Sequence, residues 1–176
     1  HNIDPSFWEM WSLMGIDCLW FDMEHHAHNM ETANQLFRAT RVGTSDVICR
    51  IGKGEWMRMG RALEAGATGI LYPRIDDAAE AREVVRWARF APLGERGCDG
   101  GNPDMPYCAM DYADYVKTAN EETFVIVQCE SKSTLPHLDE IFAVDGVDGV
   151  MLGPCDFSVL SGFPGDRKST RLNSSH

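Results

Sequence analysis

Five short apolar runs are spread along the chain, and each has the length of a β-strand. None of them shows a sustained alternation of apolar and polar residues, so both faces of each strand are expected to be buried, as in a parallel sheet. The runs span residues 17–22, 47–51, 69–73, 123–128 and 147–152.

Segments with apolar residues at helical spacing lie between these runs. The predicted helices span residues 29–42, 54–65, 76–90, 111–121 and 133–144. Asn29 is suited to cap the first of them, and the third begins with aspartates and ends with arginines, as the helix dipole favours. The regular exchange of strand and helix predicts parallel βαβ units.

The spacing of the runs indicates how many units are present. The interval between residues 69 and 123 is about two units long and contains a segment rich in Gly and Pro, 90–104, in which we expect one short strand near Arg96. Five or six βα units of a (β/α)8 TIM barrel, incomplete at both ends, are therefore predicted in this α/β chain. A doubly wound sheet is the competing architecture, but its phosphate loop G-x-G-x-x-G is absent.

Composition narrows the class of protein. Hydrophobic residues make up 44% of the 176 and charged residues 24%, and the formal net charge is -11, which argues against a nucleic-acid partner. The six cysteines form no C-x-x-C pair, so the signatures of a zinc or redox site are missing and a reducing, cytoplasmic compartment is expected. No apolar run approaches 18 residues and no leader is visible, so neither a membrane span nor a signal peptide is expected.

The last eleven residues, 166–176, differ from the rest. They show no apolar periodicity and resemble the translation of a common sequencing adapter. We interpret residues 1–165 as one partial barrel domain and 166–176 as a tail that is not native; a disordered natural tail is the alternative. On this interpretation the natural protein continues beyond Gly165.

Polar and charged residues follow every apolar run. In a β/α barrel the carboxyl ends of the strands point to a common centre, where active sites lie. Buried strands that end in charge are costly unless the charges meet a partner or a metal. The residues concerned are Asp22 at the end of the first run with Glu24, His25, His26 and His28 after it, Arg50 in the second, Arg74 after the third, Gln128 at the end of the fourth with Glu130 after it, and Gly153, Pro154, Cys155 and Asp156 after the fifth.

Four motifs in order resemble the HpcH/HpaI aldolase family, which includes 4-hydroxy-2-oxoheptanedioate and 2-dehydro-3-deoxyglucarate aldolases. They are D-x-E-H in WFDMEHHAHNMETA, E-A-G-A-x-G-I-x-x-P in LEAGATGILYPRI, G-x-R-G in LGERG, and G-V-D-G-V-x-x-G-P-x-D-x-S in GVDGVMLGPCDFS. The resemblance covers roughly residues 15–165. It implies a phosphoenolpyruvate/pyruvate-type TIM barrel and a carbon–carbon lyase.

The resemblance also implies a metal-dependent mechanism on a 2-oxo acid. Glu130 and Asp156 would hold a divalent cation of the Mg or Mn class, since such hard cations take carboxylate and water oxygens. The cation would stabilise the enolate left when the aldol bond breaks. Gln128 would line the metal or substrate pocket, and the backbone at Gly153 and Pro154 would admit the substrate carboxylate.

Three further residues receive catalytic roles from the same resemblance. Arg50 would bind the ketone or enolate oxygen, His25 would act as general base or acid, and Asp22 would orient His25. A zinc site formed by the E-H-H-A-H cluster, with Glu24, His25, His26 and His28, is the competing interpretation, but no thiol pair accompanies it.

Partners and alternatives follow from the same comparison. The expected ligands are a small-molecule 2-oxo acid and an aldehyde, and the full-length protein is expected to form a homo-oligomer, a hexamer, through C-terminal helices. A citryl- or malyl-thioester lyase is the alternative enzyme, although it needs a basic coenzyme A surface that this acidic chain does not show. The alternative without activity is a truncated fragment, insoluble or inactive by itself because sheet edges stay unpaired. Arg74 departs from the family, which usually has an apolar residue there, and is expected either to contact a second substrate or to be exposed.

Overall fold

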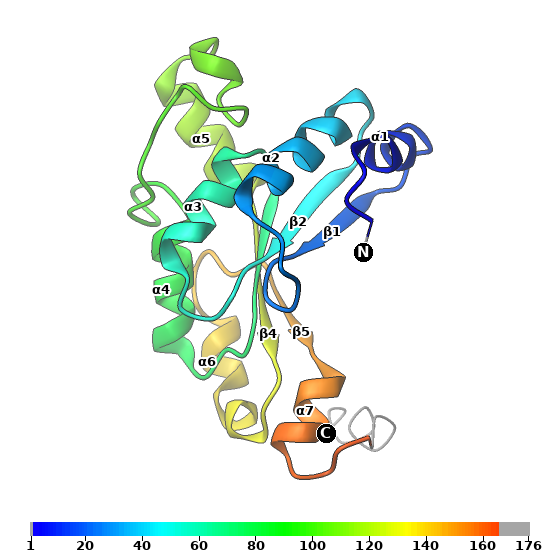
Figure 1. The fold of residues 1–176 in the computed structure, drawn as a ribbon. Helices are drawn as coiled ribbons and strands as arrows, with labels where there is room; N and C mark the ends of the chain where they lie inside the picture. Colours follow the sequence, from blue (N-terminus) through cyan, green and yellow to red (C-terminus); the bar gives the residue numbers. More distant parts are fainter. Residues whose placement is uncertain (1, 166–176) are drawn as a thin grey trace.

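The computed structural model describes residues 2–165 as a sheet of five parallel strands covered by helices (Figure 1). The strands are β1 (Cys18–Asp22), β2 (Asp46–Arg50), β3 (Gly69–Tyr72), β4 (Phe124–Cys129) and β5 (Gly149–Leu152), and they pair in the order β1-β2-β3-β4-β5. A doubly wound sheet reverses its strand order part of the way across, whereas a barrel keeps strands in chain order. The fold is therefore a partial TIM barrel, as the sequence predicts.

Seven α-helices connect or flank these strands in the described part of the chain. They are α1 (Pro5–Leu13), α2 (Met30–Ala39), α3 (Trp56–Glu64), α4 (Ala78–Ala88), α5 (Tyr112–Glu122), α6 (Leu138–Phe142) and α7 (Pro154–Leu160), with 3-10 turns η1 (Thr40–Val42), η2 (Pro106–Cys108) and η3 (Lys132–His137). The predicted cap is confirmed, because the Asn29 side chain accepts a hydrogen bond from the Thr32 amide at 2.8 Å. Helices α1 and α7 were not predicted from the sequence. For α1 a start signal is present, because Asp4 caps the helix and Pro5 is its first residue.

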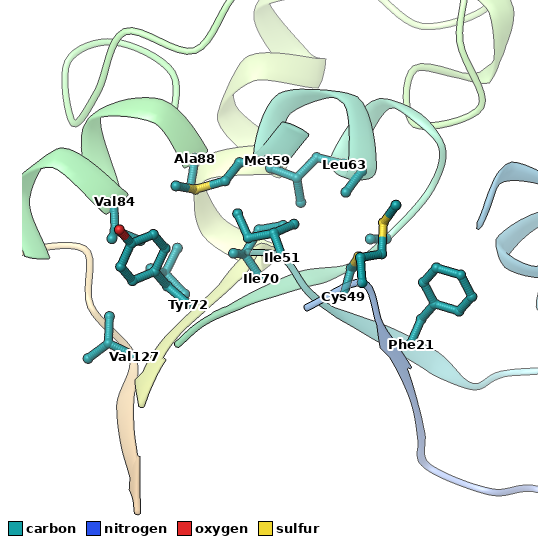
Figure 2. Close-up of a cluster of buried hydrophobic side chains, with 14 of the residues drawn as sticks. Phe21, Cys49, Ile51, Met59, Leu63, Ile70, Tyr72, Val84, Ala88 and Val127 are labelled. Carbon is teal, nitrogen blue, oxygen red and sulfur yellow. The ribbon is translucent and has the colours of Figure 1, made fainter. Parts of the chain in front are cut away.

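The core lies between the sheet and its helices. Cys49 and Ile70 point from the strands toward Met59 and Leu63 of α3 (Figure 2). Tyr72 stacks on Trp56 at the start of α3, with 5.3 Å between the ring centres. Strand residues alternate between the two faces of a sheet, and the opposite face is covered less completely. On that face the residues Trp20 and Phe124 are 49% and 44% exposed.

The short strand expected near Arg96 is not formed, and that prediction was wrong. Strand β3 pairs directly with β4, with Gly69 opposite Phe124, so the sheet leaves no position between them. The segment is instead a loop organised around the buried Arg96 guanidinium, which lies 4.6 Å from the centre of the Phe90 ring and 2.7 Å from the Asp104 carboxylate. This segment is too rich in Gly and Pro to form a strand, and the ion pair between Arg96 and Asp104 stabilises it as a loop.

Two other expectations concern the C-terminal tail and membrane-spanning helices. The proposed tail, 166–176, lies outside the described residues. Within residues 2–165, no helix is both long enough and apolar enough to span a bilayer.

The six cysteines are expected to differ sharply in reactivity. All carry free thiols, but Cys49 and Cys129 are buried whereas the other four are exposed. Burial raises the pKa of Cys49 to about 12, and a buried thiol is both protonated and inaccessible. Brief treatment of the folded protein with iodoacetamide at pH 8, read by peptide mass spectrometry, should modify the exposed cysteines and spare these two. Rapid labelling of Cys49 without unfolding would contradict the packing of β2.

Candidate active site

The ends of β1 and β2 lie side by side and bring two opposite charges together. Asp22 and Arg50 are the last residues of these strands and are paired in register. The Arg50 Nε and Nη2 atoms donate to the two Asp22 oxygens at 2.9 and 2.5 Å. This two-point contact fixes the plane of the guanidinium, which a single hydrogen bond would leave free to rotate.

The pair also fixes the charges of both partners. Burial favours a higher pKa for Asp22, but the hydrogen bonds and positive charge of Arg50 outweigh it and hold that pKa below its ordinary value. Burial likewise favours a lower pKa for Arg50, and Asp22 reverses the effect. Asp22 also accepts hydrogen bonds from the backbone amides of Glu24 and His25. Its contact with His25 therefore runs through the backbone, while the imidazole lies elsewhere.

Glu24 occupies a central position to which sequence analysis gave no role. Its side chain is only 5% exposed, and its oxygens lie 3.3 Å from Arg50 Nη1 and 3.3 Å from Arg74 Nε. Neither oxygen has a hydrogen-bond partner of good geometry among residues 2–165, so these ion pairs are loosely aligned. The signal that could have identified Glu24 is its place within the D-x-E-H motif.

His25 lies at the open side of this cluster. Its side chain is 53% exposed, with Nε2 at 3.5 Å from Glu24 Oε2 and 3.8 Å from Asp156 Oδ2. The structure therefore brings His25 next to the first turn of α7, which follows β5 and is distant from His25 in sequence. An exposed imidazole beside carboxylates can exchange protons with a bound ligand.

Glu130 is a buried carboxylate just after β4. Its side chain is among the largest fully buried ones, and its Oε2 accepts a hydrogen bond from the Arg74 amide at 2.9 Å. Burial raises the pKa of Glu130 to about 7; the negative charges of Asp156 and Glu24 act in the same direction, against the Arg74 amide and Arg50. A positive charge placed beside this group would therefore favour its ionised form.

Gln128 and Gly153 complete the same wall. Gln128 is buried, and its Oε1 accepts a hydrogen bond from Arg50 Nη1 at 3.4 Å. A Cβ atom added at Gly153 would lie 2.2 Å from Glu130 Oε1 and 2.7 Å from Gln128 Nε2. Residue 153 must therefore be glycine for these two side chains to keep their positions. Pro154 begins α7, and Asp156 lies in its first turn.

Replacing Gly153 with alanine should damage this wall without touching the core. We expect Gly153→Ala to displace Glu130 and to lower the melting temperature by several degrees, since overpacking costs about 1–3 kcal/mol. Gly60→Ala on α3 is the matched control, because a Cβ atom at that position meets nothing within 4 Å. Equal thermal denaturation curves for the two variants would show that Glu130 does not lie against residue 153.

The donor set fits a hard divalent cation. Among residues 2–165, no group of three or more histidine, cysteine, aspartate or glutamate side chains is arranged to hold a metal ion. Two carboxylates, Glu130 and Asp156, are nonetheless close enough for the charge of one to raise the pKa of the other. Oxygen ligands of this kind, supplemented by water and substrate, are what Mg²⁺ takes.

Two cavities lie near the ends of the sheet, and only one reaches this cluster. A cavity of about 440 Å³ borders Asp22, Arg50 and the indole of Trp20. A cavity of about 480 Å³ lies at the opposite, amino-terminal ends of the strands, beside Asp46, Thr68 and Phe124. The larger cavity is remote from the clustered charges, so the ends of the strands that carry Asp22 and Arg50 form the better candidate site.

The chain is similar in sequence to known aldolases. The chain is 36% identical over 163 residues to the hydroxypyruvate/pyruvate aldolase of Roseovarius nubinhibens, covering 93% of this chain and 63% of that protein. It is 34% identical over 158 residues to the 2-keto-3-deoxy-L-rhamnonate aldolase of Klebsiella pneumoniae, covering 90% of this chain and 59% of that protein. The chain thus spans about three fifths of the length of these curated relatives.

The fold and the family model agree with the sequence relatives. The crystal structure of an HpcH/HpaI aldolase from Desulfitobacterium hafniense superposes with a TM-score of 0.90 at 30% identity, covering 99% of this chain and 67% of that one. The model of the family described as HpcH/HpaI aldolase/citrate lyase matches residues 2–175. The chain therefore belongs to the HpcH/HpaI aldolase/citrate lyase family.

Proposed function

We propose that the full-length protein is a metal-dependent aldolase of the class II type, which cleaves or forms the carbon–carbon bond between a pyruvate-type 2-oxo acid and an aldehyde. The observation that carries this proposal is the position of Arg50. It is a buried, permanently charged guanidinium, held in plane by Asp22, on the same side of the sheet as Glu130 and Gln128. Such a group suits an oxygen on which negative charge develops.

Glu130 and Asp156 are the residues that would hold a divalent cation of the Mg or Mn class. A cation bound there would supply Lewis-acid stabilisation of the enolate oxygen. The fit rests on Glu130, a buried carboxyl whose pKa is raised to about 7 by burial and by the charges of Asp156 and Glu24, so that a bound cation would favour its ionised form. Gly153 leaves the space in which the Glu130 carboxylate lies, and Pro154 follows it at the start of α7.

The chain's own side chains would bind the 2-oxo acid and move the proton. Arg50 donates to the ketone oxygen, while Gln128 holds Nη1 of that guanidinium in place. His25, exposed and close to Asp156, removes the proton from the aldol hydroxyl in cleavage and returns it in synthesis. Asp22 acts as a positioning residue for Arg50 and for the backbone of His25.

The proposal also includes the compartment and the oligomeric state of the full-length protein. Six free thiols suit a reducing cytoplasmic compartment. Assembly of the full-length protein into a homo-oligomer remains part of the proposal, and sedimentation or light scattering would measure it.

The decisive experiment is cleavage by the full-length protein before and after removal of divalent cations. We expect pyruvate release from a 4-hydroxy-2-oxo acid, measured by coupled reduction of the pyruvate, to be lost after dialysis against EDTA and restored by MgCl2 or MnCl2. Activity that survives chelation would overturn the metal-dependent mechanism. No pyruvate from any 4-hydroxy-2-oxo acid tested would overturn the aldolase proposal itself.

We further propose that residues 1–165 alone are insoluble or inactive. The inner face of the sheet exposes Trp20 and Phe124, and β1 and β5 form its two edges. Open edges and apolar faces promote association. Monodisperse, active material from this segment would contradict the proposal.

A further inference from the structure

Arg74 lies in an unusual backbone conformation directly after β3. Its φ angle is +49°, in the left-handed region that residues with a Cβ atom rarely adopt. The peptide groups on its two sides are both held: its amide donates to Glu130 Oε2 at 2.9 Å, and its carbonyl accepts from Lys53 Nζ at 2.6 Å. A costly conformation fixed from both sides directs the side chain to a defined place.

That place is the exposed border of the candidate site. Arg74 Nε lies 3.3 Å from Glu24 Oε1, and the Arg74 side chain is 48% exposed. Among residues 2–165, Glu24 is the only acidic side chain that pairs with Arg74. The terminal nitrogens of its guanidinium are therefore available to a ligand that arrives from solvent.

Arg50 provides the contrast within the same cluster. Its side chain is only 11% exposed, and its nitrogens already contact Asp22, Glu24 and Gln128. Glu24 lies between the two guanidinium groups, so one of them faces the interior and the other faces the entrance. The two arginines are thus suited to different parts of the reaction.

The proposed reaction leaves one reactant without a binding partner. The carboxylate and ketone of the 2-oxo acid are assigned to Arg50 and to the wall around Glu130, whereas the aldehyde must approach from the exposed side, near His25. We propose that Arg74 selects the aldehyde by binding an anionic group, a carboxylate or a phosphate, at the end remote from the reacting carbonyl. This inference rests on the proposed aldolase function. A guanidinium matches both anions through two parallel hydrogen bonds.

The test compares matched aldehydes in the synthetic direction, with the metal-loaded full-length protein. Butanal and 4-oxobutanoate share a four-carbon chain and differ in the terminal carboxylate, while glyceraldehyde and glyceraldehyde 3-phosphate differ only in the phosphate. The wild type should favour a charged member over its neutral partner in kcat/KM. In Arg74→Met that preference should fall about ten- to a hundredfold, as expected for a charge-assisted hydrogen bond.

Three further variants separate recognition from a general effect. Arg82→Met removes the same side chain from the exposed face of α4 and should keep the preference. Arg74→Lys, which keeps the charge but loses the planar fork, should retain only part of it. Lys53→Met, which releases the Arg74 carbonyl, should lower it less than Arg74→Met does. Thermal denaturation of each variant checks folding. If Arg74→Met does not fold, Arg74→Lys and Lys53→Met still measure the effect of Arg74 on the preference for the charged aldehyde.

The outcomes are distinguishable. A loss of preference confined to the carboxylate pair or to the phosphate pair supports the inference and identifies the anion. The same charged-to-neutral ratio in the wild type and Arg74→Met, or no preference in the wild type, overturns it while turnover of the neutral aldehydes leaves the aldolase proposal standing. Absence of turnover with all four aldehydes overturns the proposed function.

Discussion

Replacement of Glu130 with glutamine is expected to lower kcat of the full-length protein about a thousandfold or more. Glutamine keeps the shape of the side chain but removes the charge that would hold the cation, and Lewis-acid stabilisation contributes several kcal/mol to such reactions. The Arg74 amide would still have an acceptor, so the fold should survive. The measurement is pyruvate release together with Mn²⁺ binding followed by electron paramagnetic resonance.

Glu140→Gln is the matched control for this variant. Glu140 is an exposed residue of α6, 71% accessible at its side chain, and its replacement should leave both activity and Mn²⁺ binding unchanged. Wild-type Mn²⁺ affinity in Glu130→Gln would remove Glu130 from the proposed ligand set.

The pH dependence of stability offers an independent view of Glu130. Its pKa of about 7 in the folded protein lies above the ordinary value of 4.5. A carboxyl with a raised pKa contributes stability below its unfolded pKa, and this contribution is lost as the pH rises from about 4.5 through about 7. In EDTA, the melting temperature of the wild type relative to Glu130→Gln should therefore fall between pH 5 and pH 8. A difference that stays constant over this range would contradict burial of the carboxyl.

Replacement of Arg50 is expected to produce the second large effect. Arg50→Lys keeps a positive charge but cannot form the two-point contact with Asp22, so kcat should fall about 10²- to 10³-fold, as for loss of an oxyanion donor. Arg50→Met should in addition cost about 3–5 kcal/mol of the free energy of unfolding, because it leaves Asp22 without its arginine and Glu24 with the exposed Arg74 alone.

A double-mutant cycle separates the two consequences of losing Arg50. In an Asp22→Asn background the stability cost of Arg50→Met should be clearly smaller, since one of the stranded charges is already gone. The loss of kcat should persist in that background, because Arg50 itself is assigned to the substrate oxygen. Additive stability effects would mean that Asp22 and Arg50 are not coupled. Chemical denaturation and steady-state kinetics supply the two measurements.

Sequence patterns predicted the strands better than the connections. All five strands fall within two residues of the apolar runs at each end, because a strand buried on both faces leaves a continuous apolar signature. The pattern failed in the segment around Arg96, where a loop is held by an ion pair with Asp104. Interactions between side chains remote from regular hydrogen bonding leave no periodic signal.

For the candidate site, the sequence predicted which residues take part but not which of them pair with one another. The ends of the apolar runs and the family resemblance indicated Asp22, His25, Arg50, Gln128, Glu130 and Asp156 as a set, and the structure brings these residues to one end of the sheet. Their partners could not be read from spacing. Asp22 pairs with Arg50 of the next strand, and Glu24 joins Arg50 to Arg74, because register across the sheet decides which neighbouring charges meet.

What the sequence by itself determined is the order of elements, the family and the identity of the charged groups that follow the strands. These depend on local patterns and on motifs of a few residues. What only the tertiary structure decided is which of these groups are buried, which are exposed and which share a partner. Glu130 and Arg74 illustrate the reason: one is a buried carboxyl and the other an open guanidinium, although both follow a strand, since burial depends on loops that meet in space from distant parts of the chain.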